Sequence, residues 1–177
     1  MDFDILKQQI ETAAKNAFLE MYKKHGTEDI YSFALYSDEG AMTVCPSSNT
    51  LEALQNIDED DAVYYKYEPA EWAYEMQGAD DEFNNICTQL RQELDRNEDN
   101  DEWFNEFQGK LYSTCIEVLE KLKNENFFKN ITGKNIFLIF TVSDYEFEKQ
   151  DLKDIIIRLN DNEYKGEYLE WMETWGN

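Results

Sequence analysis

The residue types that support nucleophilic catalysis are scarce in this chain. It contains one histidine, His25, and three cysteines, Cys45, Cys87 and Cys115. A nucleophilic side chain needs an adjacent general base, and no spacing in the sequence places His25 beside any of the cysteines. His25 instead precedes Gly26 at the expected end of a helix, where the helix dipole favours a positive side chain for structural reasons alone.

Sequence signatures of bound cofactors are missing as well. None of the seven glycines falls in a phosphate-binding loop, and no cysteines have the C-x-x-C spacing of a zinc site. Carboxylate pairs can act as general acid and base, but 39 acidic residues make any chosen pair uninformative. We therefore expect no catalytic residues and no cofactor, with an enzyme that uses a carboxylate or metal site as the alternative.

One segment has the spacing of a calcium-binding loop. Oxygen-bearing side chains occupy its alternate positions, and a glutamate stands at the twelfth: Asp95, Asn97, Asp99, Asp101 and Glu106. Calcium loops use this order of ligands, but with glycine at the sixth position. Here the sixth residue is Asn100, the eighth is Glu102 in place of an apolar residue, and no sister loop occurs. A solvated link between two helices is therefore the preferred interpretation, and a calcium site is the weaker one.

Two features of the composition occur together: a formal net charge of −23 and an aromatic content of 15%. Acidic chains with few aromatic residues stay disordered, because they cannot bury enough apolar surface to offset backbone entropy. Eleven Phe, eleven Tyr and four Trp predict an ordered core beneath an acidic shell instead. Such a shell repels nucleic acids and anionic membranes, and attracts basic proteins and cations.

The acidic residues are densest between residues 58 and 106, where seventeen acidic side chains stand against three basic ones. Tyrosine and tryptophan are interleaved with them. Carboxylates that steer association and aromatic anchors that hold it are typical of a surface that binds a basic protein. The candidate partner-binding residues are Asp58, Glu59, Asp60, Asp61, Tyr65, Trp72, Glu75, Asp99, Asp101, Glu102 and Trp103. The alternative is a solvated face that only keeps the protein soluble, with the aromatic residues in the core.

The sequence also indicates a cellular compartment. The first residues lack the basic region and long apolar core of a signal peptide. No later apolar run approaches the ~18 residues of a membrane-spanning helix. The three cysteines are odd in number and widely spaced, as expected for reduced core thiols of a cytoplasmic protein.

The element around which we expect the fold to be organised is a hairpin over residues 30–45, with its turn at 37–40. Pro46 is expected to end the second strand, because proline has no amide proton to donate. Asn49 or Thr50 can then cap a short helix over 51–57. The β-prone run 62–67 predicts a possible further strand, and the apolar run 136–142 predicts a central strand covered on both faces.

Helices account for most of the remaining sequence. Apolar residues at three- and four-residue spacing predict helices over 3–25, 80–95, 103–122, 152–159 and 164–175, and Pro69 can open a helical turn. Gly26 is expected to close the first helix in the left-handed conformation. The fold class is therefore α+β: one domain over residues 1–177, with a small, mostly antiparallel sheet packed with five to six helices.

Four stretches of the sequence resemble an uncharacterised bacterial family, the domain of unknown function numbered four-three-zero-three. They are YSFALYSDEGAMTVCPSSNTLEAL from Tyr31, YYKYEPAEWAYE from Tyr64, FFKNITGKNIFLIFTVSD from Phe127, and the late RLN that ends at Asn160. The most specific pieces are AMTV (41–44) and PAEWAYE (69–75). The resemblance covers most of the chain from residue 31 to 160, and the family offers no catalytic residues to carry over.

Similar small acidic domains are often encoded beside bacterial toxins as immunity proteins, so the resemblance implies toxin neutralisation by analogy. The leading hypothesis is an immunity-type protein whose acidic surface covers the basic substrate-binding face of a toxin, such as a nuclease domain. A structural or oligomeric protein, with Trp72, Trp171 and Trp175 buried in a self-interface, is a further alternative.

Overall fold

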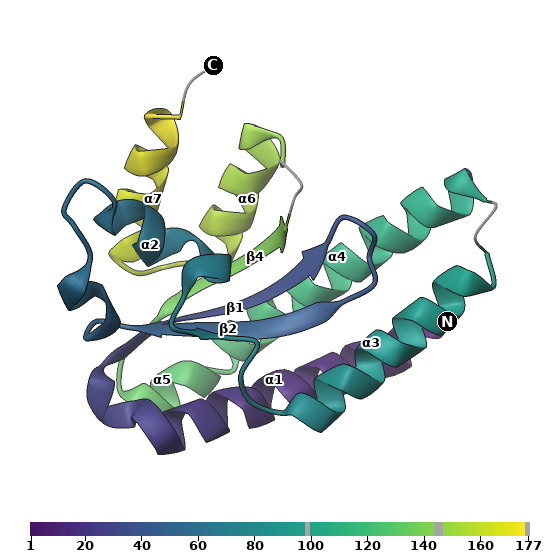
Figure 1. Ribbon diagram of the computed structural model, residues 1–177, viewed down its shortest axis with the longest axis horizontal. Helices are drawn as coiled ribbons and strands as arrows, with labels where there is room; N and C mark the ends of the chain where they lie inside the picture. The colour runs from purple at the N-terminus through teal and green to yellow at the C-terminus, as the bar shows by residue number, and fades with distance from the viewer. Residues whose placement is uncertain (98–99, 144–146, 176–177) are drawn as a thin grey trace.

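The computed structural model describes residues 1–97, 100–143 and 147–175. A four-stranded sheet lies between two layers of helices (Figure 1). The strands are β1 (Ile30–Asp38), β2 (Val44–Thr50), β3 (Tyr74–Glu75) and β4 (Phe137–Ser143). The α-helices are α1 (Phe3–His25), α2 (Ala62–Tyr67), α3 (Asp80–Asp95), α4 (Asp101–Asn124), α5 (Phe127–Thr132), α6 (Lys149–Leu159) and α7 (Tyr164–Glu173).

The fold is α+β, and its sheet is mixed. The strand order is β3-β2-β1-β4. β1 pairs with β2 and β2 with β3 in antiparallel fashion, whereas β1 and β4 run parallel. The antiparallel hairpin expected over 30–45 is confirmed, but its turn lies at 39–43 instead of 37–40, because β1 continues to Asp38 and β2 begins at Val44. The parallel pairing is the feature that the sequence did not predict.

The strand β4 lies at an edge of the sheet, so the expectation of a central strand was wrong. Its coverage on both faces is confirmed. Leu138 and Phe140 belong to the core formed with α1, α3 and α4, whereas Phe137 and Ile139 belong to the core formed with α2, α6 and α7. A continuous apolar run reports burial of both faces, which an edge strand can also have when helices cover it.

The second hairpin strand does not end at Pro46 but continues to Thr50. The carbonyl of Pro46 accepts a hydrogen bond from the Met76 amide, on the β3 side of β2. In an antiparallel strand the N–H and C=O of one residue point to the same side. The amide proton that Pro46 lacks would therefore face β3 and not β1. β3 pairs with β2 at Ser47 and Ser48. The hydrogen bonds between β2 and β1 are therefore unaffected by the proline.

The segment 62–67 forms the short helix α2, so the possible strand there was wrong. Val63 and Tyr67, four residues apart, lie on one side of this helix and pack into the core with α6 and α7. This tertiary packing overrides the β-propensity of the tyrosines and valine. The expected helix over 51–57 is a 3₁₀ turn, Ala53–Asn56, and the Thr50 hydroxyl accepts from the Ala53 amide as predicted for a cap.

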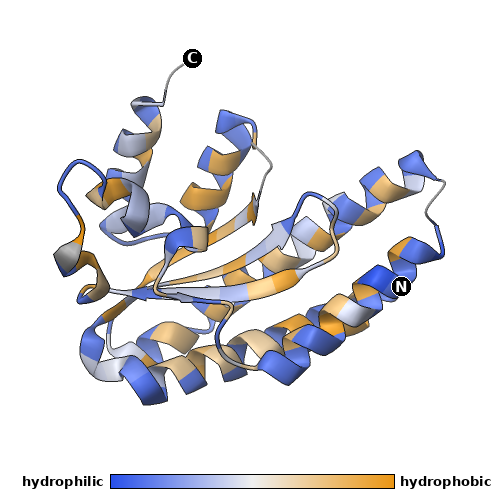
Figure 2. Ribbon diagram, in the orientation of Figure 1, coloured by the Kyte–Doolittle hydropathy of each residue, from blue (hydrophilic) through white to orange (hydrophobic). Residues whose placement is uncertain are grey.

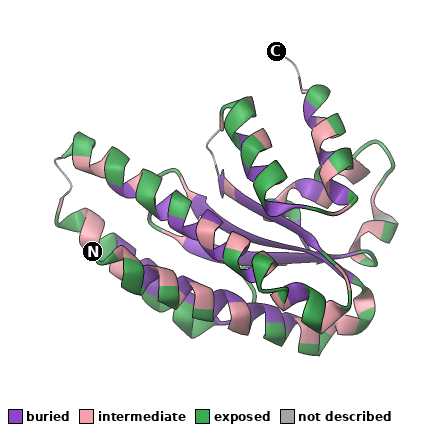
Figure 3. Cartoon of the chain, turned by 180° about the vertical axis from the view of Figure 1, so that it is seen from behind, coloured by how far each residue is buried: buried purple, intermediate pink, exposed green. Residues whose placement is uncertain are grey.

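The longer helices lie where the apolar spacing placed them. α1 ends at His25 and α3 spans 80–95, as expected. Gly26 is right-handed, with φ −61°, and Asp29 adopts the left-handed conformation instead, because a 3₁₀ turn (Gly26–Glu28) follows α1 directly. Apolar residues concentrate on the strands and on the inner faces of the helices (Figure 2), and the strands are the most deeply buried elements (Figure 3).

Candidate functional site

The acidic candidate residues do not form one surface. Asp58–Asp61 precede α2, at the end of the molecule where α2 and α7 lie (Figure 1). Asp101, Glu102 and Trp103 begin α4 at the opposite end, beside the end of α3. Asp99 lies outside the described residues. Proximity along the chain suggested a single surface, and the helix α3 separates its two halves.

Trp72 is not available as an exposed anchor. It is 3% exposed and packs edge-to-face against Tyr31. Its indole nitrogen donates to the carbonyl of Lys66, over 3.1 Å. The structure therefore assigns Trp72 to the core that joins β1 to α2, which corrects the expected partner-binding role.

The other aromatic candidates are partly exposed. Trp103 stacks on Phe107 with ring centroids 4.8 Å apart. Tyr65 is half-buried and packs edge-to-face against Tyr64, which is 45% exposed. The candidate Glu75 is half-buried and accepts a hydrogen bond from the Tyr36 hydroxyl, over 2.7 Å.

Helix α7 adds acidic residues that the sequence reasoning missed. We call the combined patch the α2/α7 acidic surface, and its members are Asp58, Glu59, Asp60, Asp61, Glu68, Glu71, Glu163, Glu167 and Glu170. The ammonium group of Lys66 joins its two halves, because it pairs with Glu167 over 2.6 Å and lies over the Tyr164 ring. Residues 163, 167 and 170 recur at helical spacing, which is typical of a solvated helix face. No local sequence pattern shows that this face lies beside α2.

The α2/α7 acidic surface carries little compensating charge. Residues 52–75 and 161–173 contain thirteen acidic side chains and two lysines. Burial, followed by the negative charge of Glu71, raises the pKa of Glu68. Burial also raises the pKa of Tyr64, together with the charges of Glu68 and Glu71. The charges of Glu68 and Glu71 therefore act on Tyr64 in the same direction as its burial.

Several positive residues of α1, α4 and α6 form ion pairs between these helices. Lys7 pairs with Glu117, Lys121 with Glu11 and Arg158 with Glu120, each over 2.6 Å; these pairs join α1 to α4 and α4 to α6. The hydrogen bond from Arg158 lowers the pKa of Glu120. The negative charge of the molecule is thus distributed unevenly, and its uncompensated part includes the α2/α7 acidic surface.

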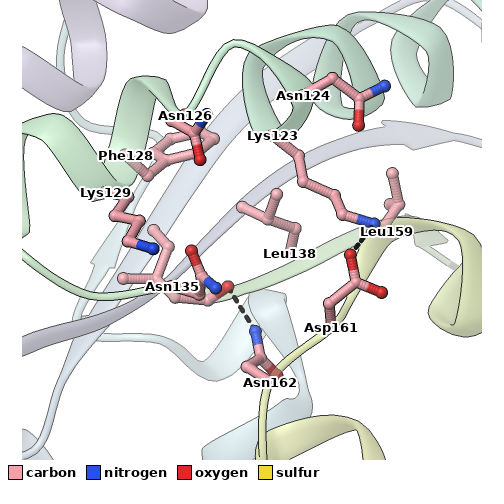
Figure 4. Close-up of a pocket in the computed structure, with 11 residues that line it drawn as sticks. Lys123, Asn124, Asn126, Phe128, Lys129, Asn135, Leu138, Leu159, Asp161 and Asn162 are labelled. Carbon is pink, nitrogen blue, oxygen red and sulfur yellow. Dashed lines mark hydrogen bonds and ion pairs between the residues drawn. The ribbon is translucent and has the colours of Figure 1, made fainter.

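A polar pocket of about 220 Å³ lies between the α4–α5 turn, the start of β4 and the α6–α7 connection (Figure 4). Its polar groups largely bond one another. Lys123 pairs with Asp161 over 2.7 Å, and the Asn162 amide donates to the carbonyl of Ile136 over 2.7 Å. Ammonium and amide groups of this kind can bind an anion or a carbonyl.

The histidine lies in a separate cluster that ties the end of α1 to β3. His25 Nδ1 is 2.7 Å from one carboxylate oxygen of Glu28, and the imidazole stacks on the Tyr74 ring with centroids 4.1 Å apart. The Tyr74 hydroxyl donates to the other carboxylate oxygen. The hydrogen bonds from Tyr74 and His25 lower the pKa of Glu28. None of the cysteines takes part in the described contacts of this cluster, which therefore has the geometry of a structural tie.

The candidate calcium ligands are engaged elsewhere or exposed. The Asn97 amide donates to the carbonyl of Glu93 over 2.9 Å, and Glu106 pairs with Lys110 over 2.6 Å. Asp95 and Asp101 are exposed at two different helix ends, and Asp99 falls outside the described residues. Among the described residues, no group of three or more His, Cys, Asp or Glu is placed to hold a metal ion.

The sequence of this chain matches a known protein family. Residues 10–161 match the family model Domain of unknown function (DUF4303). The chain belongs to the DUF4303 family. The matched region includes all four strands and the helices between them, so the resemblance noted in the sequence is confirmed. It stops before α7, whose acidic residues lie beyond the DUF4303 match.

The other comparisons add no relative. No curated protein and no solved structure matches the chain. Within the described residues, none of the helices is long and apolar enough to span a membrane.

Proposed function

We propose that this DUF4303 protein is an acidic protein-binding module that neutralises a basic partner by stoichiometric binding, as an immunity protein neutralises a toxin. The observation that carries the proposal is the α2/α7 acidic surface. Lysine and arginine side chains compensate negative charge across α1, α4 and α6, whereas the segments 58–71 and 163–170, which contain the nine acidic residues of this surface, include two lysines. A surface of this kind attracts a cationic face and repels nucleic acid.

The surface also has aromatic groups that can anchor a partner. Tyr64 is exposed, and Tyr65, Trp171 and Trp175 are half-buried. Trp171 stacks on Tyr67 and contacts Trp175 edge-to-face. Rings that are already held in place lose little entropy when a partner covers them, and such rings are frequent binding hot spots.

The proposed partner is the basic substrate-binding face of a toxin, such as a nuclease domain, and the proposed compartment is the bacterial cytoplasm. A nuclease must present positive charge to bind phosphates. The α2/α7 acidic surface would occupy that face in place of the substrate. The three cysteines are buried and free, which suits a reducing compartment.

The test uses a basic toxin nuclease domain as the partner, taken from the gene adjacent to that of this chain where this gene encodes one. Its association rate with the purified chain is measured at low and at high salt, together with inhibition of its activity at increasing molar ratio. We expect stoichiometric inhibition, and an association rate that falls steeply with salt. Inhibition that is absent at any molar ratio would overturn the proposal.

Charge-reversal variants separate the two ends of the molecule. Replacing Asp58–Asp61 by lysine should slow association on the order of tenfold at low salt, and Glu163→Lys with Glu170→Lys should act in the same direction. The matched control is Asp101→Lys with Glu102→Lys at the opposite end, which should leave the rate near that of the wild type. An unchanged rate in the first two variants, or an equal loss in the control, would contradict the assignment of the surface.

A further inference from the structure

Two cysteines from different elements line the same surface cleft. Cys45 of β2 and Cys87 of α3 border a cleft of about 190 Å³, together with Arg91 and Met76. Their residues are 6% and 7% exposed. The thiols are therefore shielded from large reagents, while a molecule the size of hydrogen peroxide can reach them through the cleft.

The contacts of Cys87 explain why α3 brings it to this strand. Its sulfur donates to the carbonyl of Val44, over 3.5 Å, and Val44 directly precedes Cys45. β3 pairs with β2 only at Ser47 and Ser48 among the described residues. The Val44 carbonyl lies before this pairing and accepts from Cys87 instead of from a strand. The two thiols border the same cleft, and each is close enough to shift the pKa of the other.

The backbone that borders the cleft is strained. Met76 and Ala79 adopt left-handed conformations, with φ of 53° and 52°, and Gly78 between them has φ 94°. A side chain at Gly78 would meet the backbone of Ala17, because a Cβ atom there would lie 2.9 Å from the Ala17 Cα. Left-handed non-glycine residues cost free energy and concentrate at functional sites. The strain is a second observation, independent of the cysteines, at the same place.

The electrostatic setting distinguishes the two cleft thiols from the third. The neighbouring Cys45 thiol lowers the pKa of Cys87 and the positive charge of Arg91 acts in the same direction, against burial and the negative charge of Asp38. The pKa of Cys45 is raised, by the neighbouring Cys87 and by burial. Burial alone raises the pKa of Cys115, which is 0% exposed within α4. A thiolate is the reactive form of cysteine, so the cleft favours reaction at Cys87.

We propose that Cys45 and Cys87 form a peroxide-sensitive dithiol that closes to a disulfide between β2 and α3. The Cys87 thiolate attacks one oxygen of hydrogen peroxide: an S–O bond forms, the O–O bond breaks, and the leaving hydroxide takes a proton to become water. The sulfur of Cys45 then attacks the Cys87 sulfenic acid: the S–S bond forms, the S–O bond breaks, and a second water leaves with the Cys45 proton. Two thiols are oxidised and one peroxide is reduced.

The test is oxidation of the folded, fully reduced chain with hydrogen peroxide, followed by intact-mass measurement and peptide mapping. We expect the loss of two hydrogen atoms, a linked pair of peptides that contain Cys45 and Cys87, and reversal by dithiothreitol. Oxidation of Met76 would instead add one oxygen atom and link no peptides. A chain that gains only oxygen, or that links Cys115, would overturn the proposal.

Single variants resolve the two steps. Cys45→Ser should stop the reaction at the Cys87 sulfenic acid, which peptide mapping detects as one oxygen atom added to Cys87, whereas Cys87→Ser should abolish both this added oxygen and the cross-link. Arg91→Gln should slow the first step severalfold and leave the circular dichroism spectrum unchanged. Cys115→Ala is the matched control and should oxidise like the wild type. If a cleft variant fails to fold, the cross-link in the wild-type chain decides the question by itself.

Discussion

The side chain of Asn160 pairs with the backbone of Leu138 as a neighbouring strand would. Its Oδ1 accepts from the Leu138 amide over 2.8 Å, and its Nδ2 donates to the Leu138 carbonyl over 2.7 Å. Leu138 lies in β4, whose partner in the sheet is β1, so this amide satisfies the strand edge that faces away from β1. A buried edge with unpaired backbone groups would be costly, and one asparagine removes that cost near the start of the strand.

Replacing Asn160 by alanine should destabilise the fold strongly. Asn160 is 0% exposed, and its loss leaves the amide and carbonyl of Leu138 without partners in the core. We expect the free energy of unfolding to fall by about 2–4 kcal/mol, since each unsatisfied buried group costs roughly 1–3 kcal/mol. Urea unfolding measures the change.

The control for this prediction is Asn162→Ala. Asn162 is half-buried and donates to the carbonyl of Ile136 at the same edge, over 2.7 Å, and more weakly to Asn160 Oδ1, over 3.3 Å. Its loss should cost about 1 kcal/mol, as for a typical single hydrogen bond. Equal costs for the two variants would show that the paired amide of Asn160 has no special role.

Glycines 78 and 109 should respond in opposite directions to alanine. At Gly78, φ is 94° and the added Cβ would lie 2.9 Å from backbone atoms of Ala17, so α1 or the segment before α3 must shift. Gly109 lies within α4, is exposed, and has nothing within 4 Å of an added Cβ. We expect Gly78→Ala to destabilise by more than ~1 kcal/mol and Gly109→Ala to stabilise by roughly 0.5–1 kcal/mol. Thermal unfolding of both variants distinguishes these signs.

Alanine substitutions of Trp72 and Tyr64 should differ strongly in their effect on the free energy of unfolding. Trp72→Ala removes a core ring and the hydrogen bond to the Lys66 carbonyl, and should cost about 3–5 kcal/mol in chemical unfolding. Tyr64 is exposed, so Tyr64→Ala should change stability by less than ~0.5 kcal/mol. A small cost for Trp72→Ala would contradict its assignment to the core.

The elements that the sequence predicted well are those whose information is local. The apolar spacing of α3 gave residues 80–95, and two β-prone runs around a turn gave the hairpin. The class of the fold followed from these elements. The position of β4 did not, because an apolar run reports burial of both faces and says nothing about which strand lies beside it.

The candidate site shows the same division. The acidity of residues 58–61 is evident in the sequence. That they lie near α7 is not, because it depends on contacts between segments about 100 residues apart, such as Lys66 with Glu167. The same limit applies to Cys45 and Cys87, which are 42 positions apart and meet because α3 packs on β2. Trp72 looked like part of a binding surface because its sequence neighbours are acidic, and tertiary packing placed it inside.

The hydrogen bond from Tyr74 to Glu28 should make stability depend on pH. The bonds from Tyr74 and His25 hold the pKa of Glu28 below its ordinary value of 4.5. A carboxyl group whose pKa is lower in the folded state contributes stability that is present above 4.5 and is lost as the pH falls through the folded value. Burial and the same bond raise the pKa of Tyr74 to about 12, so the tyrosine's contribution is lost as the pH rises from 10 towards 12.

Replacing Tyr74 by phenylalanine tests this interaction with the pH as the variable. At pH near 7 the variant should lose about 1 kcal/mol of unfolding free energy, a modest value because Glu28 is partly exposed. The loss should shrink in acid, where Glu28 is protonated in both proteins, and again in strong alkali. Tyr65→Phe is the matched control, because the Tyr65 hydroxyl makes no hydrogen bond within the described residues. A loss that stays constant from acid to neutral pH, or that Tyr65→Phe reproduces, would contradict the assignment of Tyr74 as the main partner of Glu28.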